Sequence, residues 1–266
     1  MLAMPLGVLL SFGTLPVSGR SSNEDVNDAS EETATATEAP AALNYVALGD
    51  SLAVGTGAYH RGYVDRYADH LRADTGRPVS VVNLGRDGQT SSELLHSLRQ
   101  DASWRRSVSA ADVITFNIGF NDLGRAGEAY ENGACGGADD RECLRAAVQT
   151  LKENWDAVIA ELLSLHPTGD TLIRTIGLGH TPRIFVDDTT SWPSEGKIED
   201  LRILKPYVEE VNRHIATTAA DKGVPYVEVY LEEGHVNPDG VHPNDEGYRV
   251  IAERLRELGY GPSEVG

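Results

Sequence analysis

The chain is poor in lysine and cysteine and lacks any long uninterrupted apolar run. Only four of its 266 residues are lysines, and only two are cysteines. Acidic residues outnumber basic ones by 41 to 23, which gives a formal net charge of -18. A polyanion would be repelled, so nucleic acid is not an expected partner. The histidines, cysteines and carboxylates do not group at zinc or magnesium spacings, so neither a metal nor another cofactor is expected.

The N-terminal segment does not have the length of a membrane anchor. Residues 2–17 are mostly apolar, but prolines and glycines interrupt them and they are too short to span a bilayer. We interpret residues 1–20 as a secretory signal segment, although no Lys or Arg precedes Arg20, and we expect an exported protein. Residues 21–42 are mostly Ser, Thr, Ala, Glu, Asp and Asn, a composition that predicts a flexible acidic tether.

Residues 43–266 are expected to form one folded domain, because the 40% hydrophobic content suffices for one sizeable core. Short apolar runs alternate with amphipathic helical patterns, as in a parallel sheet wrapped by right-handed crossovers. Thr90 and Glu93 form a capping box for one of these helices. We expect a strand at each of residues 45–48, 79–84, 112–118, 172–176 and 226–230.

Four polar turns should meet at the carboxyl edge of this sheet, where ligands bind in open α/β folds. The first is Gly49-Asp50-Ser51, where a sharp turn lifts Ser51 out of the sheet and Ser51 is expected to cap the helix that follows. The others contain Gly88, Asn121 and the pair Asp239 and His242.

Together these turns supply the parts of a serine hydrolase. His242 would be the base for Ser51, and Asp239 would orient the imidazole. The backbone N–H groups of Ser51 and Gly88 and the Asn121 amide would bind the oxyanion. A structural reading stays open for each part, since Asp and Ser often end strands and cap helices and a lone histidine in a loop is usually surface.

In these motifs the chain resembles a GDSL-type, or SGNH, hydrolase. Gly49-Asp50-Ser51-Leu52 matches the first block, Gly119-Phe120-Asn121-Asp122 matches Gly-x-Asn-Asp, and Asp239-Gly240-Val241-His242 matches Asp-x-x-His. The resemblance implies a flavodoxin-like three-layer α/β/α sandwich with a five-stranded parallel sheet. It also implies ester hydrolysis through an acyl-enzyme on Ser51. Gly88 is taken as the second-block glycine because it precedes Gln-Thr and a helix, although Gly85 is also available.

The substrate is expected to be a small-molecule ester, and a monomer is favoured. The family includes lipases, esterases, thioesterases and carbohydrate deacetylases, which share these motifs. The apolar segment 177–198 favours an acyl-chain ester over the alternative, an O-acetylated carbohydrate. A rival of another class is a non-catalytic binding module that keeps the fold without turnover.

Two further features lie near the expected site. Segment 177–198 lacks clear periodicity yet holds large apolar side chains, so it is either a loop packed on the core or a lid, with Phe185 or Trp192 against the acyl chain. A glycine-rich loop is expected to follow Asn121 and Asp122. Cys135 and Cys143 lie in it, and we expect them to form a disulfide beside the mouth of the active site.

Overall fold

The computed structural model describes residues 40–179, 181–185 and 201–260. The compact unit to which these residues belong begins at Pro40. The predicted signal segment and nearly all of the predicted tether therefore lie outside the described residues, and so does Trp192.

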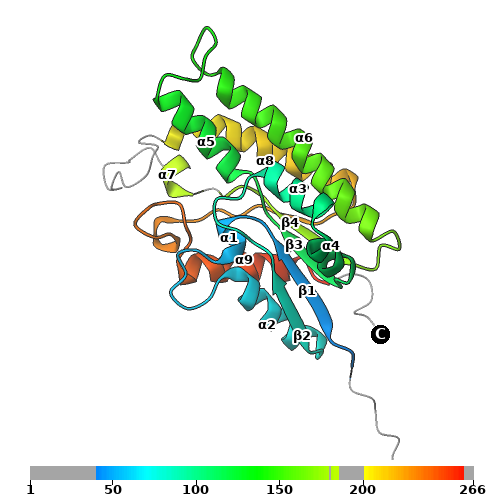
Figure 1. Ribbon diagram of the computed structural model, residues 1–266. Helices are drawn as coiled ribbons and strands as arrows, with labels where there is room; N and C mark the ends of the chain where they lie inside the picture. The colour runs from blue at the N-terminus through cyan, green and yellow to red at the C-terminus, as the bar shows by residue number, and fades with distance from the viewer. Residues whose placement is uncertain (1–39, 180, 186–200, 261–266) are drawn as a thin grey trace, which may run out of the picture. The chain divides into compact units, whose positions relative to one another are not determined.

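Five parallel strands form one sheet in the order β2-β1-β3-β4-β5 (Figure 1). The register brings the carboxyl ends of neighbouring strands level: Leu48 lies opposite Phe116, and Ile176 lies opposite Val227. The turns that leave these strands therefore meet at one edge, as expected for an open α/β sheet. The strands are β1 (Leu43–Leu48), β2 (Val79–Asn83), β3 (Val113–Phe116), β4 (Leu172–Ile176) and β5 (Tyr226–Val227).

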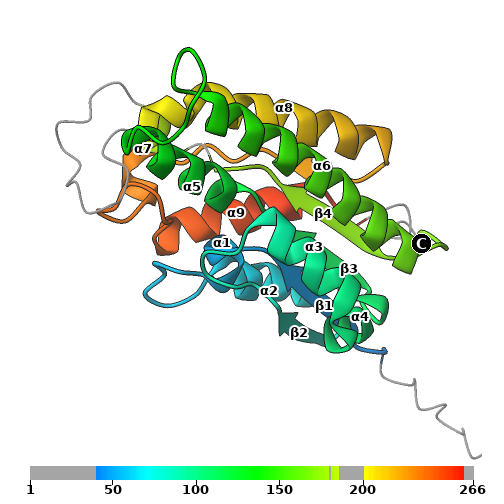
Figure 2. The same cartoon turned by 45° about the horizontal axis from the view of Figure 1, so that its top comes forward.

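Helices cover both faces of the sheet, which makes the predicted three-layer sandwich (Figures 1 and 2). One face packs on α2 (Tyr63–Thr75) and α9 (Asp245–Glu257). The other face packs on α3 (Ser91–Gln100), α4 (Ala102–Ser109), α5 (Phe120–Glu131), α6 (Glu142–Leu165) and α8 (Lys205–Asp221). The short elements are α1 (Ser51–Val54), α7 (Pro182–Phe185), η1 (Leu201–Leu204) and η2 (Glu233–His235).

Local sequence explains where several helices begin. Thr90 and Glu93 form the predicted capping box at the start of α3, with each side chain bonded to the other residue's backbone N–H. Asn244 caps α9 by accepting from the N–H groups of Glu246 and Gly247. These caps fix the entry of both helices just beyond the carboxyl edge of the sheet.

The structure corrects the sequence-based expectation in three places. The stretch after Asn121 was expected to be a glycine-rich loop, but it forms α5, whose Leu123 and Ala126 are buried beside glycines that hide the helical period. The last strand has two residues rather than the expected five. Ser51 does not cap the helix that follows it, because Asp50 is the N-cap and Ser51 is the first helical residue.

Within the described ranges, no helix is both long and apolar enough to cross a bilayer. The same residues contain no group of three or more His, Cys, Asp or Glu side chains that could hold a metal ion.

Candidate active site

The turn that carries Ser51 is constrained by close backbone packing. Gly49 has a φ of 143°, and a Cβ there would lie 2.4 Å from the carbonyl oxygen of Asn117. Only glycine fits this approach and this conformation. Oδ1 of Asp50 then accepts from the N–H of Leu52 at 3.1 Å, which starts α1 at Ser51. The sheet and the cap together fix the position of the Ser51 hydroxyl.

The Asp239–His242 turn holds its imidazole by the same kind of local bonding. Oδ1 of Asp239 accepts from the N–H groups of Val241 and His242, each at 2.9 Å. Oδ2 lies 2.6 Å from Nδ1 of His242. Because an ionised carboxylate can only accept, Nδ1 carries the proton, and Nε2 of the neutral ring is left as an acceptor.

The two turns meet, although Ser51 and His242 are far apart in the sequence. Nε2 of His242 lies 3.2 Å from Oγ of Ser51, within reach of a hydrogen bond. The side chain of Asn237 ties the two loops together by donating to the carbonyl oxygens of Gly57 and Pro243, each at 3.0 Å. The structure thus brings the three predicted triad residues into one hydrogen-bonded line.

The charges of the pair suit this arrangement. Burial opposes ionisation of Asp239, but the hydrogen bonds from His242 and from two backbone N–H groups outweigh it and lower the pKa of Asp239 to about 2. The hydrogen bond to Asp239 raises the pKa of His242 above 6.5 against the opposing effect of burial. An imidazole placed in this way accepts a proton more readily than a free one.

The turn that contains Gly88 lies against the Ser51 turn. The N–H of Arg86 donates to the carbonyl oxygen of Gly49 at 2.9 Å. The N–H of Gln89 donates to the carbonyl oxygen of Arg86 at 3.1 Å and closes a tight turn. Gly88 in this turn has a φ of 71°, a conformation that favours glycine. On the far side of this turn, the side-chain amide of Asn121 donates to the carbonyl oxygen of Gln89 at 3.0 Å. Asn121, Gly88 and Ser51 therefore belong to one bonded set of turns.

The two candidate glycines of this loop differ in what their N–H groups do. The N–H of Gly85 donates to Oδ1 of Asn83 at 3.0 Å, and a Cβ at Gly85 would lie 2.8 Å from that of Ala53. Gly85 is thus explained by packing. Among the described residues, the N–H of Gly88 makes no hydrogen bond and nothing lies within 4 Å of where its Cβ would be.

An apolar cavity opens beside Ser51 and His242. Of the three expected oxyanion donors, Ser51 lines this cavity, whereas Gly88 and Asn121 do not. Four residues at the start of the segment expected to border the substrate do line it: Gly177, Leu178, Gly179 and Thr181. Phe185 ends the short helix α7, and Trp192 lies outside the described residues. The apolar lining residues are Leu52, Phe120, Ile176, Leu178, Val229, Leu231, Val241, Pro243 and Ile251.

Asp50 and Asn117 line the same cavity, and the sequence analysis assigned no chemistry to them. Asn117 donates to Oδ1 of Asp50 at 2.7 Å, and both side chains are buried. Burial raises the pKa of Asp50 from 3.8 to about 6, although the hydrogen bonds from Leu52 and Asn117 favour the ionised form. A polar residue at the end of an otherwise apolar strand was the one sequence signal that pointed to Asn117.

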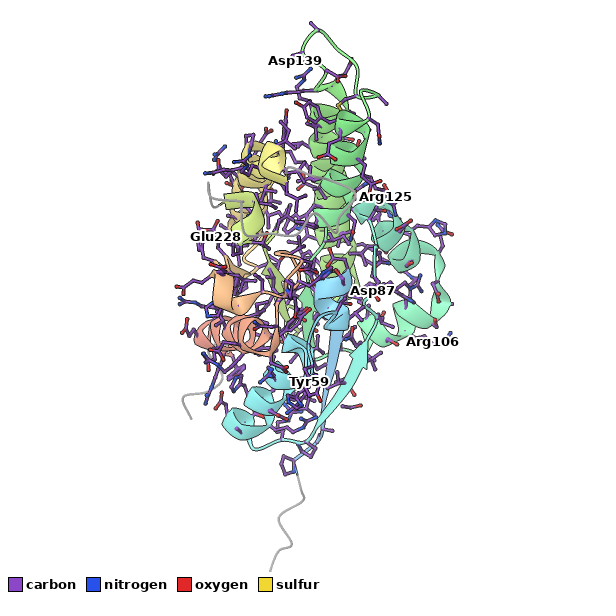
Figure 3. All side chains as sticks on the ribbon, turned by 90° about the vertical axis from the view of Figure 1, so that its left-hand side faces the viewer. Tyr59, Asp87, Arg106, Arg125, Asp139 and Glu228 are labelled. Carbon is purple, nitrogen blue, oxygen red and sulfur yellow. A yellow bond between two sulfur atoms is a disulfide. The ribbon has the colours of Figure 1, made fainter. Side chains whose placement is uncertain are left out.

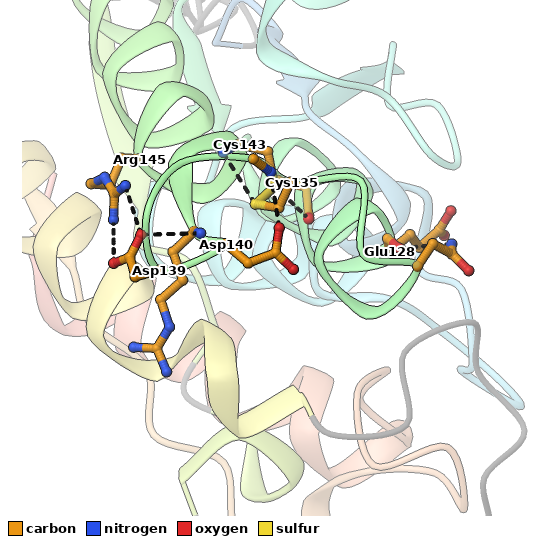
Figure 4. Close-up of a disulfide and its surroundings, with 10 residues drawn as sticks. Glu128, Cys135, Asp139, Asp140, Cys143 and Arg145 are labelled. Atoms are coloured by element: carbon orange, nitrogen blue, oxygen red, sulfur yellow. Dashed lines mark hydrogen bonds and ion pairs between the residues drawn. A yellow bond between two sulfur atoms is a disulfide. The ribbon is translucent and has the colours of Figure 1, made fainter.

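Cys135 and Cys143 form a disulfide at the loop between α5 and α6 (Figure 4). An ion pair between Asp139 and Arg145, at 2.9 Å, closes the same loop. Neither cysteine lines the cavity. Figure 3 shows Asp139 at the far end of the α5–α6 pair from Asp87, which bonds to Thr56 next to α1. The predicted disulfide is thus present, with Sγ of Cys143 3.2 Å from the carbonyl oxygen of Ala126 on α5. Its place beside the mouth of the active site stays a prediction.

Comparison with known proteins decides the family. A model of the GDSL-like lipase/acylhydrolase family matches residues 47–250, a range that runs from β1 to α9 and includes all four turns. The chain belongs to this family. The GDSL-like chain is 28% identical over 231 residues to a spore germination lipase, LipC, of Bacillus licheniformis, covering 84% of this chain and 99% of the relative.

Solved structures agree with this assignment. The GDSL-like chain superposes on the lipase Lip_vut3 from a goat rumen metagenome with a TM-score of 0.69, at 26% identity over 83% of this chain and 99% of the other. An extracellular lipase of Streptomyces rimosus has the same fold, with a TM-score of 0.58 at 21% identity over 81% of this chain and 99% of that one. The acetylxylan esterase Axe2 of Geobacillus stearothermophilus also has this fold. Its TM-score is 0.57 at 17% identity, over 82% of this chain and 94% of the esterase. This GDSL-like protein is a carboxylic ester hydrolase.

Proposed function

We propose that the enzyme hydrolyses acyl esters through a covalent acyl-enzyme on Ser51. The observation that carries the proposal is the line from Asp239 through His242 to Ser51, with contacts of 2.6 and 3.2 Å. A serine hydroxyl is a weak nucleophile at neutral pH and needs an adjacent base, and the base needs an orienting partner. The geometry supports all three roles.

The reaction then proceeds in two halves. Oγ of Ser51 attacks the ester carbonyl while its proton passes to Nε2 of His242, and the tetrahedral intermediate collapses as Nε2 returns that proton to the leaving alcohol. In the second half, water attacks the acyl-enzyme and gives a proton to Nε2, and Oγ of Ser51 recovers it as the carboxylic acid leaves. Asp239 stays ionised throughout and stabilises the imidazolium.

The oxyanion that forms in each half needs donors already in place. We assign this role to the N–H groups of Ser51 and Gly88 and to the side-chain amide of Asn121. The amide of Asn121 has two N–H bonds, and its contact with Gln89 uses one of them. Gly88 is preferred to Gly85 because the Gly85 N–H is already bonded to Asn83.

The acyl part of the substrate belongs to the apolar cavity. Its walls are mostly aliphatic side chains, which bind a hydrocarbon chain and give no hydrogen bonds to a sugar ring. The lipase name of the Bacillus licheniformis relative agrees with an acyl ester. We therefore prefer an acyl-chain ester to an acetylated carbohydrate.

A chain-length series tests both reaction and substrate. kcat/KM for p-nitrophenyl esters from acetate to palmitate should rise beyond acetate, and a serine-directed phosphonate should label wild type and not Ser51→Ala. A maximum at acetate together with release of acetate from acetylated xylan would make the enzyme a carbohydrate deacetylase. Neither turnover nor labelling would make it a binding module.

We also propose that the protein is exported, on the leader pattern and on the disulfide, which persists in oxidising compartments. Expression of the full chain in a bacterial host, followed by N-terminal sequencing of protein in the medium, tests this. Retention of the uncleaved chain in the cytoplasm would contradict it.

A further inference from the structure

A chain of buried polar groups runs from the sheet to the turn that carries Ser51. Tyr45 and Thr115 bond at 2.7 Å within the core, and the Tyr63 hydroxyl links Thr115 to Oδ1 of Asn117 at 3.5 and 3.4 Å. Asn117 ends the chain by donating to Asp50 at 2.7 Å. The orientation of the Asn117 amide is thereby set: its oxygen faces a hydroxyl donor and its nitrogen faces the carboxyl.

The carboxyl at position 50 does more than the turn requires. Asn, Ser or Thr would accept the same bond from the N–H of Leu52 and cap α1 equally well. None of them would place an ionisable group at 3% exposure, where ionisation is opposed by burial. A second role in the site, one that uses charge, accounts for the carboxyl.

The groups that face this carboxyl identify its partner. The charge of His242 favours the ionised form of Asp50, and the charge of Asp122 opposes it. The charge of Asp50 in turn opposes ionisation of the buried hydroxyls of Tyr63 and Tyr248. His242 is the one residue among these that can become a cation near neutral pH. His242 in turn has its charged form favoured by Asp239, by Asp50 and by the exposed Asp87.

We infer that Asp50 is a positioning residue that acts as a second carboxylate for protonated His242, and that Asn117 holds it ionised for this purpose. The inference rests on the proposed function, in which His242 takes up the proton of Ser51. Asp239 binds the Nδ1 side of the ring, whereas Asp50 shares the cavity with Ser51 and acts through space. The imidazolium formed during acylation and deacylation is thus stabilised by two carboxylates.

The test is kcat/KM against pH for wild type and Asp50→Asn, which keeps the shape and the cap. A charge several Å away in a partly buried site changes the pKa of an imidazole by about one pH unit, which is about tenfold in an equilibrium. The acid limb of Asp50→Asn should therefore move about one unit lower, and its plateau should fall about tenfold. The two curves should merge at low pH, since His242 is then protonated before and during the reaction.

Asp87→Asn is the matched control. It removes the same charge from the surroundings of His242, but from an exposed position where solvent and salt screen it. Its acid limb should move clearly less than that of Asp50→Asn, and addition of salt should abolish the difference from wild type.

Asn117→Ser supplies an independent variant, because it leaves Asp50 in place and removes its strongest side-chain donor. The pKa of Asp50 should then rise, so the profile should follow Asp50→Asn at neutral pH and approach wild type at alkaline pH. A wild-type measurement needs no variant at all: the ¹³C resonance of the Asp50 carboxyl and the ring resonances of His242 should show coupled titrations.

The outcomes distinguish failure of the proposed function from failure of the role inferred for Asp50. If His242→Ala keeps wild-type kcat/KM, the proposed function itself fails. If His242→Ala is inactive but Asp50→Asn lowers kcat/KM by the same factor at every pH, Asp50 is only structural and this inference alone is overturned. Independent titrations of Asp50 and His242 in wild type would overturn it as well.

Discussion

The side-chain amide of Asn117 donates to Oδ1 of Asp50 at 2.7 Å, directly behind the residue proposed as nucleophile. This bond lies in the core, where Asp50 and Asn117 are 3% and 4% exposed. The bond holds the carboxyl group of Asp50 at a buried position, where the loss of solvent opposes ionisation of the group. The site therefore contains a carboxyl group whose ionised form is opposed by burial.

Replacement of Asp50 by Asn should raise the free energy of unfolding, relative to wild type, more at alkaline pH than at acidic pH. The folded-state pKa of about 6 lies above the unfolded value of 3.8, so wild type loses stability as pH rises between these values. The loss amounts to about 3 kcal/mol, and the Asn variant does not suffer it. Urea unfolding of both proteins at pH 4 and pH 8 measures the gap. An equal difference at both pH values would contradict the account.

Replacement of Asn121 by Ala should lower kcat much more than it changes KM. The amide is proposed to bind charge that exists only in the transition state, and loss of such a donor costs about 2.7–4 kcal/mol, or 10²–10³ in kcat. Steady-state kinetics with a p-nitrophenyl ester measures both constants. Asn121 also donates a hydrogen bond to the carbonyl oxygen of Gln89, so the variant could lose stability as well as activity. Thermal unfolding of Asn121→Ala should therefore be measured beside the kinetics. A tenfold rise in KM at constant kcat would assign Asn121 to substrate binding instead.

Activity should fall as pH falls through the pKa of His242, because only the neutral imidazole can accept the serine proton. Asp239 raises that pKa above 6.5, so the loss should begin near neutrality. Asp239→Asn should lower kcat by about 10⁴-fold, as loss of the equivalent partner does in the serine protease triad, and should shift the acid limb to lower pH. The kcat/KM profile checks both. An unshifted limb in the variant would mean that another group sets it.

Removal of the disulfide should lower stability without lowering activity. Cys135 and Cys143 are eight residues apart, and the chain-entropy estimate for so short a loop is about 2–3 kcal/mol. Neither cysteine lines the cavity, so kcat/KM of the Cys135→Ser/Cys143→Ser protein at 20 °C should match wild type. Loss of activity at a temperature where the variant is still folded would show that the α5–α6 loop reaches the site.

The fold and the proximity of Ser51, His242 and Asp239 could be predicted because their signals are local. Each strand is a short apolar run, and the turns that hold Ser51, Asn121 and His242 follow strands directly or carry a compact motif. Helix α5 could not be predicted in this way, since its glycines break the period that Leu123 and Ala126 would otherwise reveal. Its existence depends on packing against α6, which no local pattern records.

The role that we infer for Asp50 could not be predicted from the sequence, because its evidence is not local. Asp50 was visible in the sequence, but Asp and Ser in such a turn are ordinary helix-capping residues. The distinctive property of Asp50 is its burial beside Asn117. That residue directly follows β3, the neighbour of β1 in the sheet, and lies 67 residues from Asp50 in the sequence.

The most direct test of the acyl-enzyme on Ser51 is intact-protein mass spectrometry of enzyme quenched by acid during turnover of a p-nitrophenyl ester. Wild type should gain the mass of one acyl group, and peptide analysis should place it on Ser51. Ser51→Ala should gain none, and His242→Ala should acylate far more slowly. Rapid turnover with an unmodified Ser51, or an acyl group on any other residue, would contradict the account.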